Sequence, residues 1–70
     1  MNDSEITWSD AQEIGFRLWE AHPEVNPLAV RFTDLHAWVM ALDGFRGKAE
    51  ESSEGALEAI QMAWLDEVEE

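Results

Sequence analysis

The sequence predicts a small all-α domain with three helices. Its 70 residues suffice for one domain, spanning residues 1–70, with the polar residues 1–7 as a flexible N-terminal segment. Apolar residues recur at helical spacing in three segments, and no run alternates with the period of two that a strand requires. The close succession of the second and third helices suggests helix-turn-helix or winged-helix topology. This likeness concerns the fold and implies no function by itself.

The first helix is expected to begin at Ser9 and to end before Pro23. Ser9 suits an N-cap, and Gln12 three positions later completes a capping box. Proline cannot continue a helix, so Pro23 ends it. One face of this helix carries Ala11, Ile14, Leu18 and His22. Gly15 lies beside this face and costs about 1 kcal/mol relative to alanine, which suggests that a neighbouring helix approaches closely there.

A connector and a second helix follow. Asn26 and Pro27 form a pair typical of a helix cap and first helical position, which predicts a short helical turn over residues 27–31. Thr33 is expected to start the second helix, and Gly44 to stop it. The apolar stripe of this helix consists of Leu35, Trp38, Val39 and Leu42.

A flexible loop over residues 44–53 is expected to lead to the third helix. The loop holds two of the four basic residues, Arg46 and Lys48. Ser52 or Ser53 then caps the helix. The apolar stripe of the third helix consists of Leu57, Ile60, Trp64 and Val68. The three stripes can enclose one common core.

The composition excludes several classes of protein. The chain has no cysteine, which rules out disulfides, thiolate nucleophiles and cysteine ligation of metal clusters. The N-terminus lacks the features of a signal peptide, and no apolar run is long enough to span a membrane, so we expect a cytoplasmic protein. Four basic residues against 16 acidic ones give a formal net charge of -12. Phosphates and anionic membranes repel such a surface, so neither nucleic acid nor a membrane is an expected partner.

The chain offers little for catalysis, and we expect a protein that is not an enzyme. Its bases are His22, His36 and carboxylates, and it has no phosphate loop, nucleophile elbow or HExxH motif. His36, Met40 and Asp43 share one helix flank, but we interpret His36 as a half-exposed boundary residue rather than a metal ligand. The many carboxylates predict weak binding of hard cations such as Ca²⁺, Mn²⁺ or iron at several surface positions.

The acidic C-terminus is the most informative stretch for function. The last turns of the third helix carry four carboxylates, those of Asp66, Glu67, Glu69 and Glu70. Carboxylates at this end oppose the helix dipole, whereas Asp10 and Glu13 lie near a helix start, where structure alone explains them. The C-terminal group is therefore either a solubilising end or an acidic patch for a basic partner or a cation.

Four aromatic residues divide into two pairs. Trp38 and Trp64 lie on apolar stripes and are expected in the core. Phe16 and Trp19 project away from the stripe of the first helix. Each of these two side chains either is exposed for a partner or covers a loop.

In three segments the sequence resembles the IscX family, small acidic proteins of bacterial iron–sulfur cluster assembly. The matching segments, in order, are WSDAQEIG (8–15), NPLAVRFTDLHAWV (26–39) and LEAIQMAWLDE (57–67). The resemblance implies a modified winged-helix-like, mainly helical domain. It also implies a non-enzymatic adaptor or regulator of cluster assembly. The lack of cysteine agrees with a protein that carries no iron–sulfur cluster itself.

The resemblance also implies partners and site residues. IscX-like proteins bind a cysteine desulfurase at a basic surface that a frataxin-like protein also uses, and they bind iron weakly through exposed carboxylates. Carried over to this sequence, the metal-binding residues are Asp10, Glu13, Asp34, Asp66 and Glu67. The expected partner-binding residues are the matched positions Asp34, Asp66 and Glu67, together with Glu69 and Glu70 from the acidic C-terminal run. The loop after Phe45 departs from the family's acidic pattern, so no contact is placed there. We expect a monomer.

Two functions of other classes remain open at this point. The first is a DNA mimic, an acidic domain that occupies the groove of a basic protein unrelated to iron. The second is a plain structural module whose charge only keeps it soluble, which predicts no partner.

Overall fold

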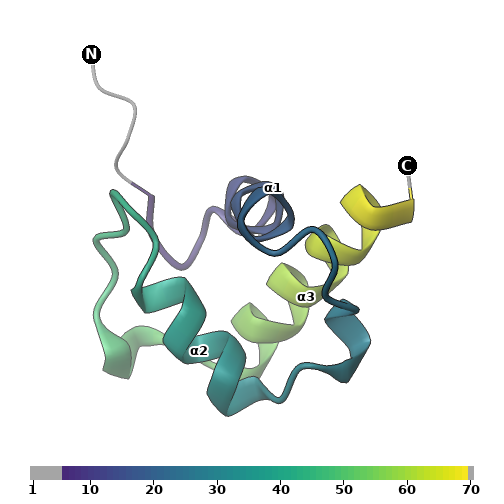
Figure 1. The fold of residues 1–70 in the computed structure, drawn as a ribbon. Helices are drawn as coiled ribbons and strands as arrows, with labels where there is room; N and C mark the ends of the chain where they lie inside the picture. The colour runs from purple at the N-terminus through teal and green to yellow at the C-terminus, as the bar shows by residue number, and fades with distance from the viewer. Residues whose placement is uncertain (1–5, 70) are drawn as a thin grey trace.

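The computed structural model describes residues 6–69 and is all-α, as predicted (Figure 1). Three helices and two short 3₁₀ turns follow one another along the chain. They are α1 (Ala11–Ala21), η1 (Pro27–Ala29), α2 (Phe32–Met40), η2 (Ala49–Glu51) and α3 (Glu54–Glu69). Within the described residues, β-structure is limited to one isolated parallel bridge between Ile6 and Phe45. The structure is therefore a three-helix domain.

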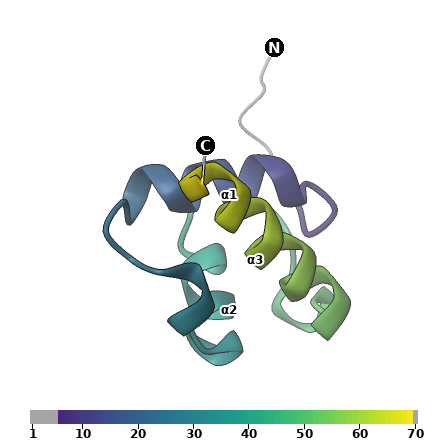
Figure 2. The same cartoon turned by 90° about the vertical axis from the view of Figure 1, so that its right-hand side faces the viewer.

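The closest contact between helices is where α3 crosses α1 (Figure 2). A Cβ atom at Gly15 would lie 2.7 Å from the backbone nitrogen of Trp64 and 2.8 Å from the Cβ of Ala63. Real Cβ atoms essentially never approach other atoms this closely. The close approach predicted from the glycine is confirmed, and the neighbouring helix is α3.

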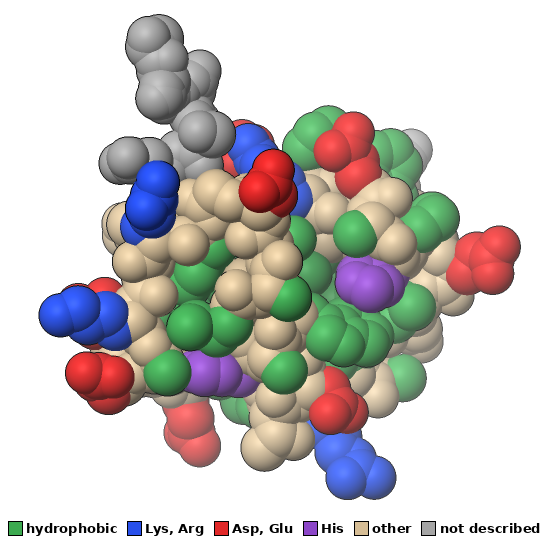
Figure 3. Space-filling model, turned by 60° about the vertical axis from the view of Figure 1, so that its left-hand side comes forward, with side chains coloured by type: hydrophobic (Ala, Val, Ile, Leu, Met, Phe, Trp, Pro, Cys, Tyr) green, Lys and Arg blue, Asp and Glu red, His purple; other side chains and the backbone are tan. Residues whose placement is uncertain are grey.

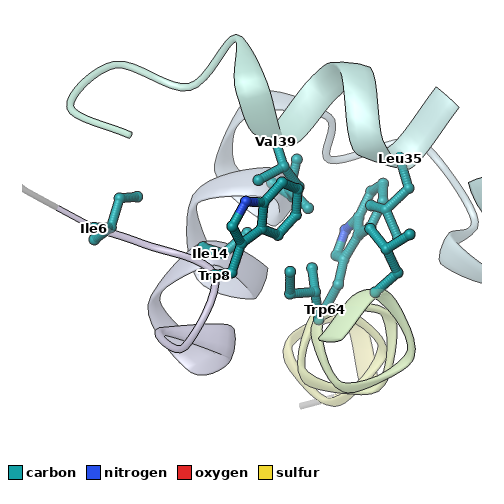
Figure 4. Close-up of a cluster of buried hydrophobic side chains, with 9 residues drawn as sticks. Ile6, Trp8, Ile14, Leu35, Val39 and Trp64 are labelled. Atoms are coloured by element: carbon teal, nitrogen blue, oxygen red, sulfur yellow. The ribbon is translucent and has the colours of Figure 1, made fainter. Parts of the chain in front are cut away.

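The core lies between the three helices (Figure 4). Its buried side chains come from all three helices and from the segment before α1. They are Ile6, Trp8, Ile14, Leu18, Leu35, Val39, Leu57, Ile60 and Trp64. Trp64 is fully buried, as predicted, whereas Trp38 is only partly buried. Val68, which was expected on the core stripe, is exposed because it lies beyond the last buried residue of α3.

Two of the predicted helix caps are confirmed. The Oδ1 atom of Asn26 accepts a hydrogen bond from the backbone N–H of Leu28 at 3.0 Å. The Oγ atom of Ser53 accepts one from the backbone N–H of Ala56 at 3.1 Å. The turn after Asn26 is shorter than predicted and covers residues 27–29, because Val30 is already extended.

Three predicted helix limits are wrong by a few residues. Asp10, not Ser9, is the N-cap of α1, and its side chain faces back to Thr7 rather than into the helix. Helix α2 begins at Phe32, one residue before Thr33. It also ends at Met40, because residues 41–44 form a turn that closes at Gly44 with a positive φ of 86°.

The end of the N-terminal segment that was predicted as flexible, residues 1–7, makes defined contacts in the structure. Residues 1–5 lie outside the described residues, but Ile6 is buried and pairs with the 44–46 segment. The Ile6 N–H donates to the Gly44 carbonyl at 3.1 Å, and the Arg46 N–H donates to the Ile6 carbonyl at 2.8 Å. We call residues 6–8 the strap.

Trp8 fixes the strap to the loop over residues 44–53. Its Nε1–H donates to the Lys48 carbonyl at 2.7 Å, and its ring meets the Phe45 ring edge-on at 5.0 Å. A Cβ atom at Gly47 would lie 2.6 Å from the Trp8 ring, so glycine leaves the space that the indole occupies. The loop predicted as flexible is thus held by a buried side chain and contains the η2 turn.

Candidate functional site

The crossing of α1 and α3 creates a concave acidic surface. The groove has a volume of about 410 Å³ and lies between the start of α1 and the C-terminal end of α3. We call it the acidic groove, and its lining residues are Gln12, Ala63, Asp66, Glu67 and Glu69. Three of the predicted partner-binding carboxylates are therefore brought together. Glu70, the fourth predicted at this end, lies outside the described residues.

The carboxylates of the acidic groove take part in no ion pair between described side chains. The last turn of α3 contains no basic residue, so its negative charges add to the negative end of the helix dipole. Among residues 6–69, one ion pair joins two described side chains, Arg17 and Glu13. The local repulsion is relieved only by solvent, salt or a partner.

Two predicted metal ligands already have structural roles at the start of α1. The Oδ2 atom of Asp10 accepts a hydrogen bond from the Thr7 N–H at 2.9 Å. Glu13 pairs with the Arg17 Nε at 2.9 Å, one turn along the same helix. Both carboxylates also lie near the positive end of the α1 dipole, which stabilises them. Folding alone accounts for these two residues.

Asp34 is separate from the acidic groove. It lies in the first turn of α2 and is exposed. The five predicted metal ligands therefore do not converge on one point. Among residues 6–69, no group of three or more histidine, aspartate and glutamate side chains is placed to hold a metal ion. The acidic surface offers solvated carboxylates rather than a preformed metal site.

Both histidines take part in packing. The His36 Nε2 lies 3.2 Å from the Ala49 carbonyl oxygen, and its ring lies against that of Trp8 with centroids 5.2 Å apart. His36 is half-buried, which confirms the interpretation of a boundary residue. The His22 ring stacks on Trp38 with centroids 4.2 Å apart and an interplanar angle of 15°. These contacts occupy the faces of both rings.

Charge is distributed unevenly over the molecule. Residues 31–48 contain three of the four basic residues, whereas residues 49–70 contain eight carboxylates and no Lys or Arg. Figure 3 views the side of α2 and the loop, where hydrophobic side chains and both histidines occupy the middle and most charged groups stand at the margin. The acidic groove belongs to α1 and α3, and Asp66, Glu67 and Glu69 are the carboxylates that line it.

Gln12 and Ala63 were not predicted as site residues. Gln12 was interpreted only as part of a capping box, and Ala63 only as a small residue beside the core stripe. The signal that joins them is Gly15, because the close approach that it permits sets the start of α1 against Ala63. A prediction that paired Gly15 with the alanines of α3 would have located the groove.

The fold and the site define a class of protein: a small acidic helical domain with a concave surface lined by carboxylates. The family profile described as iron–sulphur cluster assembly matches residues 6–69. The chain therefore belongs to this family, the IscX family, and the resemblance seen in the sequence is confirmed. Its function lies in iron–sulfur cluster assembly.

A relative from Pseudomonas aeruginosa is 45% identical over 62 residues, which cover 89% of this chain and 94% of the relative. That relative carries the description of an uncharacterized protein. The similarity therefore extends over almost the whole domain but adds no biochemical role. Within residues 6–69, no helix is long and apolar enough to cross a lipid bilayer.

Proposed function

We propose that this protein is a non-enzymatic adaptor of iron–sulfur cluster assembly that binds the cysteine desulfurase through the acidic groove. The observation that carries the proposal is the convergence of Asp66, Glu67 and Glu69 in one groove without a described basic side chain to pair with them. A surface of this kind complements a basic patch on another protein, which supplies the missing cations and relieves the repulsion. Membership of the assembly family indicates in which system to look for that patch.

The proposal includes competition with a frataxin-like protein for the same basic surface. It also includes weak, transient association of ferrous or ferric iron with the carboxylates of the acidic groove. Hard cations accept carboxylate oxygens as ligands, and the groove supplies them. Because no three described side chains are placed to hold one metal ion together, the proposed iron is a passing cargo and not a resident cofactor.

The experiment that tests the proposal is titration of the protein into the desulfurase at low and high salt, by calorimetry or biolayer interferometry. The variant Asp66→Lys/Glu67→Lys is expected to bind at least about tenfold more weakly, since close interfacial charge pairs contribute more than 1.4 kcal/mol. Adding ferrous iron to the wild-type titration tests whether the metal alters binding.

A matched control separates a local effect from a change in net charge. The variant Glu24→Lys/Glu50→Lys changes the net charge equally, at two exposed residues that do not line the acidic groove. It is expected to keep most of the affinity. Equal losses in both double variants would show that the charge acts without a defined site, and no binding by the wild-type protein would refute the proposed partner.

A further inference from the structure

Helix α1 carries an unusual strip of side chains next to the acidic groove. Gln12, Phe16 and Trp19 follow one another at intervals of four and three residues, which places them along one flank of the helix, and Pro23 follows just beyond its end. Phe16 is 37% exposed although it is among the largest apolar side chains of the chain. The Phe16 and Trp19 rings lie 5.8 Å apart and are tilted by 44°, so they form one aromatic surface.

The aromatic pair lies beside the acidic groove. Gln12 lines the groove, and Phe16 is the next residue on the same flank of α1. Side chains of a helix lean toward its N-terminus, so Phe16 leans toward Gln12. Gly15, the neighbour of Phe16, touches Ala63, which also lines the groove. Carboxylates and an aromatic pair, in which Phe16 is exposed and Trp19 is partly buried against the core, therefore adjoin at the crossing of α1 and α3.

The other end of the strip is also hollowed. A depression of about 310 Å³ is lined by Trp19, Glu20 and Pro23. The aromatic pair thus stands between two concave regions, and each of them contains a carboxylate. Arg17 lies on the other flank of α1, where it pairs with Glu13 and donates to the Asp43 carbonyl at 3.4 Å. It does not cover the strip.

We propose that this strip is the docking surface for an arginine-bearing segment of a basic protein, with a guanidinium on the Phe16–Trp19 rings and its charge on the neighbouring carboxylates. A guanidinium is planar, stacks on aromatic rings and binds carboxylates through a fork of N–H groups. Lysine matches the carboxylates but stacks less well, and a hydrated metal ion gains nothing from the rings. For the identity of the basic protein, the proposal rests on the proposed function.

The test compares two short peptides that differ only in their cations, Gly-Arg-Gly-Arg-Gly and Gly-Lys-Gly-Lys-Gly, each with blocked ends. Binding at low salt is followed by NMR through the indole N–H signal of Trp19 and the backbone signals of Gln12 and Phe16. The wild-type protein is expected to bind the arginine peptide about two- to fivefold more tightly, the effect of an exposed cation–π contact. In Phe16→Leu, which keeps an apolar side chain but no ring, this preference is expected to disappear.

Met40 offers a matched control, because it has the same exposed fraction of 37% but lies on α2. Met40→Leu is expected to keep the preference for arginine. Equal binding of both peptides by the wild-type protein, or an unchanged preference in Phe16→Leu, would overturn the inference. Neither result involves the desulfurase, so this test is independent of the proposed partner.

The desulfurase titration then separates the two proposals. Phe16→Ala is expected to weaken desulfurase binding severalfold, whereas Met40→Ala leaves it unchanged. If the wild-type protein binds the desulfurase and Phe16→Ala binds equally well, the aromatic docking surface is wrong and the adaptor function stands. If the wild-type protein does not bind the desulfurase but prefers the arginine peptide, the docking surface stands and another basic protein is its partner.

Discussion

The two halves of α3 differ in how far packing and capping account for their side chains. Residues 54–64 begin with the Ser53 cap and an acidic first turn, and they bury Leu57, Ile60 and Trp64. Residues 65–69 bury none of their side chains and place Asp66, Glu67 and Glu69 at the negative end of the helix dipole. Packing and capping account for the residues of the first half. The helix dipole disfavours the negative charges of the second half.

The comparison separates the acidic residues that the fold stabilises from those that it does not. Carboxylates at the starts of helices, such as Asp10, Glu13 and Glu54, are stabilised where they stand. Those in the last turn of α3 cost stability, and the described part of the chain contains nothing that compensates them. A residue that weakens the fold needs another reason to be there, and binding of a basic partner supplies one.

The largest predicted effect concerns the contact between α1 and the first half of α3. Gly15→Ala is expected to destabilise the protein by about 2 kcal/mol, because the added methyl group overlaps the backbone of α3 and the helices must separate. Urea unfolding followed by circular dichroism measures the change.

Gly55→Ala is the matched control for this change. The nearest atom to a Cβ at Gly55 is the Ser53 Oγ at 3.9 Å, so the methyl group has room. Alanine is the better helix former, and this variant is expected to gain about 0.5 kcal/mol. Stabilisation by both substitutions would contradict the close packing of α1 and α3.

The next effect concerns the start of α3. Ser53→Ala removes the oxygen that accepts from the Ala56 N–H, and it is expected to cost about 1 kcal/mol. Ser52→Ala is the comparison, because the Ser52 hydroxyl donates to the Ala49 carbonyl and caps no helix. Thermal unfolding of both variants is the measurement. Equal losses would mean that the cap contributes nothing of its own.

Neutralising the end of α3 is expected to act in the opposite direction. The variant Asp66→Asn/Glu67→Gln/Glu69→Gln should gain about 1 kcal/mol at low ionic strength, since three charges no longer oppose the dipole. The gain should shrink in high salt, which screens exposed charges. Urea unfolding at the two salt concentrations tests this. A loss of stability at low salt would refute the account of the second half of α3.

The smallest predicted effect concerns Glu13 of α1, whose carboxylate pairs with Arg17. Glu13→Gln removes the ion pair with Arg17, in which both side chains are partly exposed. Pairs of this kind contribute little, so a loss of about 0.3 kcal/mol is expected. Careful urea titrations with the wild-type protein in parallel can resolve it. A loss above 1 kcal/mol would indicate that Glu13 supports more than this pair.

Much of the fold was predictable because it depends on local signals. The caps at Asn26 and Ser53 and the three apolar stripes are patterns within one or two helical turns. The contacts of the strap were not predicted, because its apolar residues form no periodic pattern in the sequence. Ile6 and Trp8 are single apolar residues in a polar stretch, and the groups that receive them lie in residues 44–48. Pairing over such distances leaves no local pattern in a sequence.

The site was predicted in part for the same reason. The charges of Asp66, Glu67 and Glu69 were visible as a run, and the structure places them in one groove. Their place at the negative end of a helix dipole already set them apart from Asp10 and Glu13, which lie near a helix start. The structure adds the partners: the Thr7 N–H donates to Asp10, whereas no ion pair between described side chains involves the three carboxylates of the groove. Such partners are known only once the chain is folded.

The strap has a consequence for the order of folding. The hydrogen bond from Trp8 to Lys48 joins residues 40 positions apart, so the closure of a long loop must precede any gain from it. Contacts of this kind form late, after the helices have met, and they are the first to open when the native state fluctuates. The amide protons of Ile6 and Arg46 should therefore exchange with solvent by local opening, well before those of Leu18 and Ile60, which await global unfolding.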